Sequence, residues 1–141
     1  MVKVKRINHV SIAVPTLDEG RSVLSILGLN SSQDELVANQ KTNTCFLQTA
    51  EGETAVELIA PAGNEALGRF LDRRGTAMHH ISLEVEDLAS TLTSLKAAGV
   101  ALVDETPRVG AHGHLVAFIH PRATGGVLFE LCQCLEGDPS S

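Results

Sequence analysis

Residues 7–17 of this chain, INHVSIAVPTL, return in altered form as residues 78–88, MHHISLEVEDL. At an offset of 71 residues the two stretches share a His, a β-branched residue, a Ser, an apolar residue, a Val and a Leu. Near the end of each half, VEL at 56–58 corresponds to FEL at 129–131, and a two-residue difference in loop length explains the offset of 73. Matches that recur in the same order indicate an internal duplication, which decides the architecture. The sequence therefore predicts two copies of one small unit.

Each copy predicts a strand, a helix and three further strands. The alternating runs His9–Val14 and His80–Val85 have the period of two that is typical of a strand with one buried face. Thr16, with Glu19 in a capping box, and Asp87 are the expected helix caps. The helices are expected to end at the aligned glycines Gly28 and Gly99. The further strands are expected at 31–38, 44–48, 54–59, 100–103, 115–119 and 127–132.

This pattern predicts an α+β fold of two tandem βαβββ modules. Module 1 covers about 5–60, a connecting helix about 64–75, and module 2 about 78–133. Both modules belong to one domain, 1–141, because neither could enclose a site alone. The tail 135–141 is expected to be flexible.

Composition narrows the class of protein. A domain of 141 residues is large enough to fold around its core without disulfides or a structural metal. The three cysteines are odd in number and lie inside apolar runs, so they are expected to be thiols in a reducing compartment, the cytoplasm. Seventeen acidic against 11 basic residues, a net charge of −6, disfavour nucleic acid as a partner. No apolar stretch approaches the roughly 20 residues of a membrane span.

The strongest chemical signal is a His and a Glu repeated in register. Alternation along the first strand of each half places His9 with Ser11, and His80 with Ser82, on one face. Glu57 and Glu130 each lie within an apolar run near the end of a half. A two-fold pairing of the halves would bring these side chains toward one cavity. Two imidazoles and two carboxylates are suitable ligands for a divalent metal with open positions for substrate.

A single His on a strand is more often a hydrogen-bonded structural residue than a metal ligand. Repetition changes this balance, because a buried carboxylate without a partner costs several kcal/mol and normally finds a metal or a cation. We therefore favour the metal site. His79 is expected to point away from His80 as a core or supporting residue, and His112 to lie in a loop from which it could reach a ligand.

The chain resembles the vicinal oxygen chelate superfamily, which includes glyoxalase I, extradiol dioxygenases and methylmalonyl-CoA epimerases. The resemblance is strongest to the epimerases and covers about 4–133. Its most specific stretches are the duplicated strands and the run PRVGAHG at 107–113, FIHPR at 118–122 and TGGVLFEL at 124–131.

The resemblance implies a curved mixed sheet around a metal site, the glyoxalase fold. By position, His9, His80 and Glu130 match the metal ligands, and Glu57 matches a fourth, where some members have Gln. One divalent ion per subunit is implied, Co²⁺ first, with Zn²⁺, Ni²⁺ or Mn²⁺ as alternatives. The implied reaction interconverts (R)- and (S)-methylmalonyl-CoA through a metal-stabilised enolate, with Glu130 as the catalytic base, in a cytoplasmic homodimer of propionate metabolism.

The sequence departs from this pattern in one place that matters. Some members carry a carboxylate as the opposing base at the position of Thr44, and no Asp or Glu occurs from Leu36 to Ala50. The second base is therefore unassigned, with an ordered water or Glu84 as alternatives. Thr44, Arg108 and His112 are the candidate substrate contacts.

Two other functions remain open. A glyoxalase I-type isomerase of thiol hemiacetals would use the same ligand types. A metal-free ligand-binding protein of the same fold would have no reason to retain all four ligand-type side chains.

Overall fold

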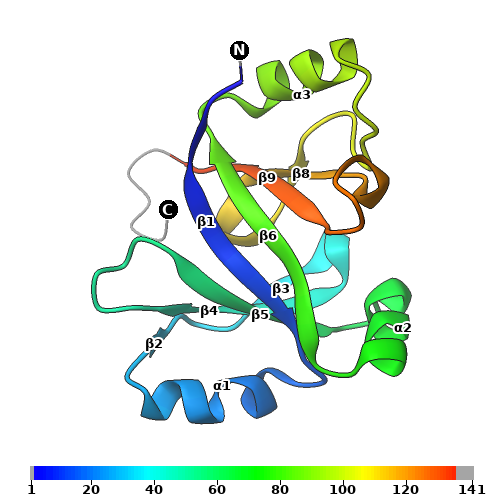
Figure 1. Ribbon diagram of the computed structural model, residues 1–141. Coiled ribbons are helices and arrows are strands. Elements are labelled where there is room, and N and C mark those ends of the chain that lie inside the picture. Colours follow the sequence, from blue (N-terminus) through cyan, green and yellow to red (C-terminus); the bar gives the residue numbers. More distant parts are fainter. Residues whose placement is uncertain (1, 136–141) are drawn as a thin grey trace. The chain divides into compact units, whose positions relative to one another are not determined.

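A computed structural model gives the structure of residues 2–135 (Figure 1). Residues His9–His79 form one compact unit, here called the first unit; the described residues up to Asn8 and from His80 onward form the second unit. Apart from Leu135, the tail expected to be flexible lies outside the described residues. None of the described helices is long and apolar enough to cross a membrane.

The first unit contains one mixed sheet and two helices. Its elements are β1 (Val4–Ala13, from His9 onward), α1 (Leu17–Ile26), β2 (Asn30–Ser31), β3 (Glu35–Val37), a 3₁₀ turn (Ala38–Gln40), β4 (Thr42–Gln48), β5 (Ala55–Pro61) and α2 (Glu65–Arg74). The strand order is β2-β4-β5-β1, and β3 also pairs with β4. β1 and β5 run parallel, whereas the other pairs are antiparallel.

The two faces of this sheet are covered by different helices. Leu17 of α1 packs against Leu47 and Leu58, in a core that also contains Val14, Cys45 and Ala60. Residues one position along the strands, Ala13 and Ile59, point to the opposite face and pack against Leu67 of α2. The predicted caps are confirmed, since Thr16 accepts a hydrogen bond from the Glu19 amide and Gly28 has a φ of 89°. Alternation therefore assigns one face to α1 and leaves the other for α2 and the His9 side chain.

The second unit repeats the pattern. Its elements are β6 (Ala77–Val85, from His80 onward), α3 (Leu88–Ala97), β7 (Arg108–Val109), β8 (Leu115–Ile119) and β9 (Phe129–Gln133). Short 3₁₀ turns lie at Ala111–Gly113 and Pro121–Ala123. The strand order is β6-β9-β8-β7, and β6 and β9 run parallel. Leu88 and Leu92 of α3 pack on Val85, Ala117 and Leu131. The predicted α+β class and the helix between the halves are confirmed.

Two predicted strands were wrong in detail. The expected strand 31–38 is divided into β2 and β3. The expected strand 100–103 is only an isolated bridge between Leu102 and Ile119. There the Asp104 carboxylate accepts a hydrogen bond from the Phe118 amide at 2.8 Å, so a side chain takes the place of a strand carbonyl.

Candidate functional site

The first unit places His9 and Glu57 together. In the parallel pair of β1 and β5, Ser11 lies opposite Glu57, so His9 lies diagonally across from Glu57 on the same face. His9 Nε2 is 3.4 Å from Glu57 Oε1. Both side chains are buried, each residue with 5% of its surface exposed. The predicted burial of Glu57 inside an apolar strand is confirmed.

The second unit builds the same pair with one addition. Ser82 lies opposite Glu130 in the parallel pair of β6 and β9, and His80 Nε2 is 3.8 Å from Glu130 Oε2. The Ser82 hydroxyl donates a 2.7 Å hydrogen bond to Glu130 Oε1. Both His80 and Glu130 are buried. This hydrogen bond fixes the orientation of the Glu130 carboxylate.

Each pair is closed on one side by a phenylalanine that sequence reasoning missed. Phe46 of β4 lies opposite Glu57, and Phe118 of β8 lies opposite Glu130. The imidazole of His9 meets the Phe46 ring edge to face, with centroids 5.2 Å apart and an interplanar angle of 82°. His80 meets Phe118 at 5.2 Å and 88°. The signal was in the sequence, because Phe46 and Phe118 are 72 residues apart and each precedes its Glu by one strand.

The donor atoms of each pair are those that a divalent metal accepts. One imidazole nitrogen and one carboxylate oxygen face each other in a buried, aromatic-lined setting. A buried carboxylate needs a positive charge nearby, which a divalent ion or a protonated imidazole can supply. Each unit therefore presents one nitrogen donor and one oxygen donor of the kinds that divalent metals bind.

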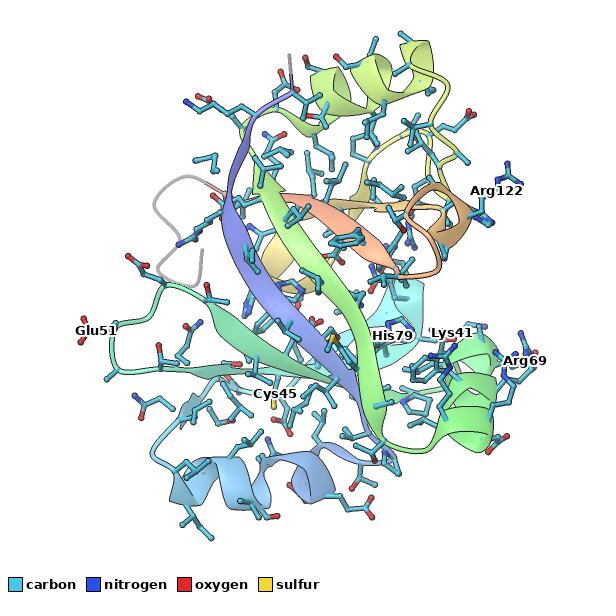
Figure 2. The ribbon with its side chains drawn as sticks, in the orientation of Figure 1. Lys41, Cys45, Glu51, Arg69, His79 and Arg122 are labelled. Carbon is cyan, nitrogen blue, oxygen red and sulfur yellow. The ribbon has the colours of Figure 1, made fainter. Side chains whose placement is uncertain are left out.

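His79 has a packing role, as predicted. Its ring meets Phe70 of α2 edge to face, with centroids 4.9 Å apart, and lies beside that helix in Figure 2. Burial lowers the pKa of His79, whereas the charge of the Glu57 carboxylate acts in the opposite direction. His79 is thus held mainly neutral against the helix.

The candidate substrate contacts lie in different surroundings. Thr44 is buried in β4 on the face of Phe46, and its hydroxyl donates to the Glu35 carbonyl oxygen at 3.4 Å. Arg108 is ion-paired with Asp104 at 2.9 Å. His112 has a left-handed backbone with a φ of 58° in the turn before β8. Their roles toward substrate stay predictions.

Glu84, the alternative second base, is occupied by ion pairs. Arg6 donates to its carboxylate at 2.9 Å, Asn8 donates at 3.1 Å, and the Lys5 amine lies 3.5 Å away. Burial acts to raise the pKa of Glu84, but the hydrogen bonds from Arg6, Asn8 and Cys134 outweigh it and hold this pKa below its usual value. These contacts are typical of a structural anchor.

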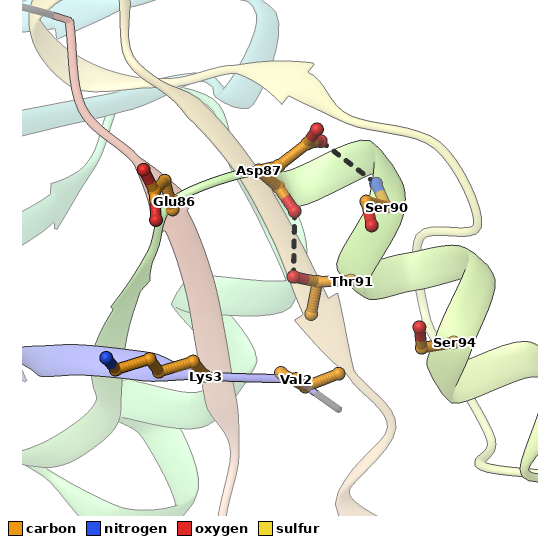
Figure 3. A pocket seen from close by; sticks show the side chains of 7 residues that line it. All are labelled: Val2, Lys3, Glu86, Asp87, Ser90, Thr91 and Ser94. Carbon is orange, nitrogen blue, oxygen red and sulfur yellow. Dashed lines mark hydrogen bonds between the residues drawn. The ribbon is translucent and has the colours of Figure 1, made fainter.

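The second unit has a polar cleft beside the start of α3, and neither His80 nor Glu130 is among its lining residues (Figure 3). Its polar groups cap the start of α3: the Asp87 carboxylate accepts from the Ser90 amide at 3.0 Å, and the Asp87 carbonyl accepts from the Thr91 hydroxyl at 2.8 Å. The lining residues are Val2, Lys3, Glu86, Asp87, Ser90, Thr91 and Ser94. None of them was predicted as a site residue.

Comparison with known proteins places the duplicated pairs in a family. Residues 8–118 match the model of the glyoxalase/bleomycin resistance protein/dioxygenase superfamily. The chain belongs to this superfamily. This superfamily member is 39% identical over 130 residues to the uncharacterized protein YqjC of Bacillus subtilis. The alignment covers 91% of each chain.

Two characterised relatives of this superfamily member carry an activity in their names. It is 35% identical to the ethylmalonyl-CoA/methylmalonyl-CoA epimerase of Cereibacter sphaeroides, over 91% of this chain and 97% of the relative. The crystal structure of methylmalonyl-CoA epimerase from Mycobacterium tuberculosis aligns with a TM-score of 0.88 at 32% identity, over 94% of this chain and 89% of that one. The resemblance to the epimerases and the predicted fold class are confirmed.

Proposed function

We propose that the protein is a metal-dependent epimerase that interconverts (R)- and (S)-methylmalonyl-CoA by removing and returning the proton at C2. One observation carries the proposal: a buried His and Glu pair is built twice, with Glu130 oriented by Ser82, in a chain 35% identical to an epimerase of this substrate class.

His9, Glu57, His80 and Glu130 are the proposed ligands of one divalent ion per subunit. Two imidazoles and two carboxylates suit Co²⁺, our first choice, and also Zn²⁺, Ni²⁺ or Mn²⁺. When bound, the ion would neutralise the negative charge that develops on the thioester oxygen as the C2 proton leaves. The equal construction of the two pairs supports a shared role.

Glu130 is the proposed catalytic base. The Ser82 hydroxyl donates to its Oε1 atom, and its Oε2 atom lies 3.8 Å from His80 Nε2, so the carboxylate is held in one orientation in which we assign it the C2 proton. Preorganisation of this kind avoids reorientation during proton transfer. Phe118 lies opposite Glu130 and packs edge to face against the His80 ring.

The names of the relatives support an acyl-CoA substrate. We expect an acyl-CoA ester of a 2-substituted malonate, contacted by Thr44, Arg108 and His112. One methylene separates the methyl from the ethyl substrate, which a pocket distinguishes by about 1–3 kcal/mol. We further propose a cytoplasmic homodimer acting in propionate metabolism.

Proton exchange tests the proposal directly. The Co²⁺-loaded protein is incubated with methylmalonyl-CoA in D₂O, and deuterium at C2 is followed by mass spectrometry. We expect exchange together with interconversion of the epimers. Isomerisation of the glutathione adduct of methylglyoxal without any exchange at C2 would instead identify a glyoxalase I-type enzyme.

Metal analysis tests the ligand set. After dialysis against a chelator, we expect activity to be lost and then restored by one equivalent of a divalent ion. Fully active protein without a stoichiometric ion contradicts the proposed metal dependence.

A further inference from the structure

Inversion at C2 requires one proton to leave a face of the carbon atom and another to arrive at the opposite face. Glu130 supplies one of these groups. We propose that Glu35 of β3 is the second catalytic acid–base group, an assignment that rests on the proposed function.

Strand register puts Glu35 on the face that carries the His9 and Glu57 pair. In the antiparallel pair of β3 and β4, Glu35 lies opposite Thr44, and directly opposed side chains point to the same face. Two residues farther along β4, Phe46 lies opposite Glu57 on that face. Within β1, β3, β4 and β5 of the first unit as described, Glu57 and Glu35 are the carboxylates of this face.

An ion pair holds the residue before Glu35 toward α1. Arg21 of α1 binds the preceding residue, Asp34, in a two-pronged ion pair, with nitrogen to oxygen distances of 2.5 Å and 2.9 Å. Asp34 is thus drawn to the side of the sheet that α1 covers. Glu35 is the first residue of β3, and its register with Thr44 places it on the other face. It is half-buried there.

The spacing suits a substrate that lies across β4. The backbones of Glu35 and Glu57 are separated by two strand spacings across the sheet and by two residues along it, which together give roughly 12 Å. Thr44 and Phe46 form the surface between them. A substrate whose C2 atom lies beside the His9 and Glu57 pair and above Phe46 would therefore have Glu35 on one side of that atom. The neutral Thr44 adds no charge that would compete with Glu35 for the proton.

The proton balance of the reaction is complete with these two groups. In one direction the Glu35 carboxylate takes the C2 proton, the electron pair of the C–H bond passes into the thioester enolate, and Glu130 as a carboxylic acid returns a proton to the opposite face. The reverse direction exchanges the roles. One group is protonated and the other ionised after each turnover, and exchange with water resets them.

The test compares Glu35→Gln with the wild type and with Glu51→Gln, whose carboxylate lies in an exposed turn (Figure 2). In Glu35→Gln we expect epimerisation to fall by about 100-fold or more. Deuterium from D₂O should still enter the epimer whose proton faces Glu130, while the other epimer stops exchanging. Bound metal and the melting temperature should match the wild type. Adding Thr44→Glu to Glu35→Gln is expected to restore epimerisation, because it returns a carboxylate to the neighbouring position.

Three results would separate this assignment from its alternatives. Epimerisation within threefold of the wild type in Glu35→Gln overturns it. Equal loss of exchange from both epimers, with metal still bound, also overturns it. A wild type that neither epimerises nor exchanges refutes the proposed function instead, before Glu35 is tested.

Discussion

Two residues beyond the serines that lie opposite the buried glutamates, the two units carry side chains of different chemistry. Ala13 and Glu84 are equivalent at the offset of 71 residues. Ala13 lies opposite Ile59 and is covered by Leu67 of α2. Glu84 lies opposite Cys132 and is covered by ion pairs from Lys5 and Arg6.

The site positions themselves are alike in both units. A Ser lies opposite each buried Glu on one side, and a Phe lies opposite it on the other. The difference at Ala13 and Glu84 shows that this end of the strand can be shielded from water either by an apolar helix residue or by ion pairs. The construction around the two His and Glu pairs is common to both units, as an internal duplication predicts.

The largest expected difference between the units is in catalysis. Glu130→Gln should abolish deuterium exchange in the epimer whose C2 proton faces Glu130, a loss of at least about 1,000-fold, because an amide cannot accept the proton, while the epimer that faces Glu35 still exchanges. Glu57→Gln should keep exchange within about tenfold of the wild type, because an amide oxygen can still bind a metal. The measurement is the exchange rate in D₂O at saturating metal. Equal losses in the two variants contradict the assignment of the base to Glu130.

A second difference lies under the helices. Gly20 of α1 is equivalent to Thr91 of α3, and a Cβ atom at Gly20 would come within 2.9 Å of Leu58 and Val14. Gly20→Thr should therefore lower the free energy of unfolding by about 2 kcal/mol through overpacking. Urea unfolding followed by circular dichroism measures it. An unchanged unfolding midpoint would mean that α1 can move away from the sheet without loss.

The serine opposite each Glu offers a smaller contrast. Ser82 donates to Glu130, whereas the Ser11 hydroxyl has no hydrogen-bond partner among residues 2–135. Ser82→Ala should lower kcat by about tenfold with little change in KM, since a hydrogen bond to a charged group is worth about 1.5–3 kcal/mol. Ser11→Ala should change kcat less than twofold. A larger loss in Ser11→Ala than in Ser82→Ala would falsify the distinction between an oriented base and a simple ligand.

The smallest expected effect is a pH dependence confined to the second unit. The lowered pKa of Glu84 means that its ion pairs stabilise the fold above its ordinary pKa of 4.5 and lose this effect as pH falls through the lower folded value. Glu84→Gln should therefore destabilise the protein at pH 7 by an amount on the order of 1 kcal/mol, and less at pH 3. Melting temperatures of both proteins across this pH range provide the check. A gap that widens toward low pH contradicts the direction of the shift.

Much of the fold could be predicted from local signals. The repeat, the alternation and the caps at Thr16 and Asp87 predict the helices and most strands, because these features depend on residues close in the chain. The expected strand 100–103 was wrong because a side chain, Asp104, bonds the Phe118 amide from a distant segment. Such a replacement of backbone by side chain has no local signature.

The site was predictable only in part. His9, Glu57, His80 and Glu130 could be found because each appears twice at the repeat offset and the glutamates interrupt apolar strands. Phe46 and Phe118 were missed because a phenylalanine in a strand is usually a core residue, and only strand pairing shows it against an imidazole.

The sequence alone determined the duplication, the class of fold and the identity of the paired His and Glu residues, because periodicity and repetition are properties of the chain itself. Strand register was decided only by the tertiary structure. Register joins segments distant in sequence, such as Ser82 with Glu130 and Glu35 with Thr44, through backbone hydrogen bonds that any residue can make. For that reason Glu35 became visible as a candidate base only when β3 was placed beside β4.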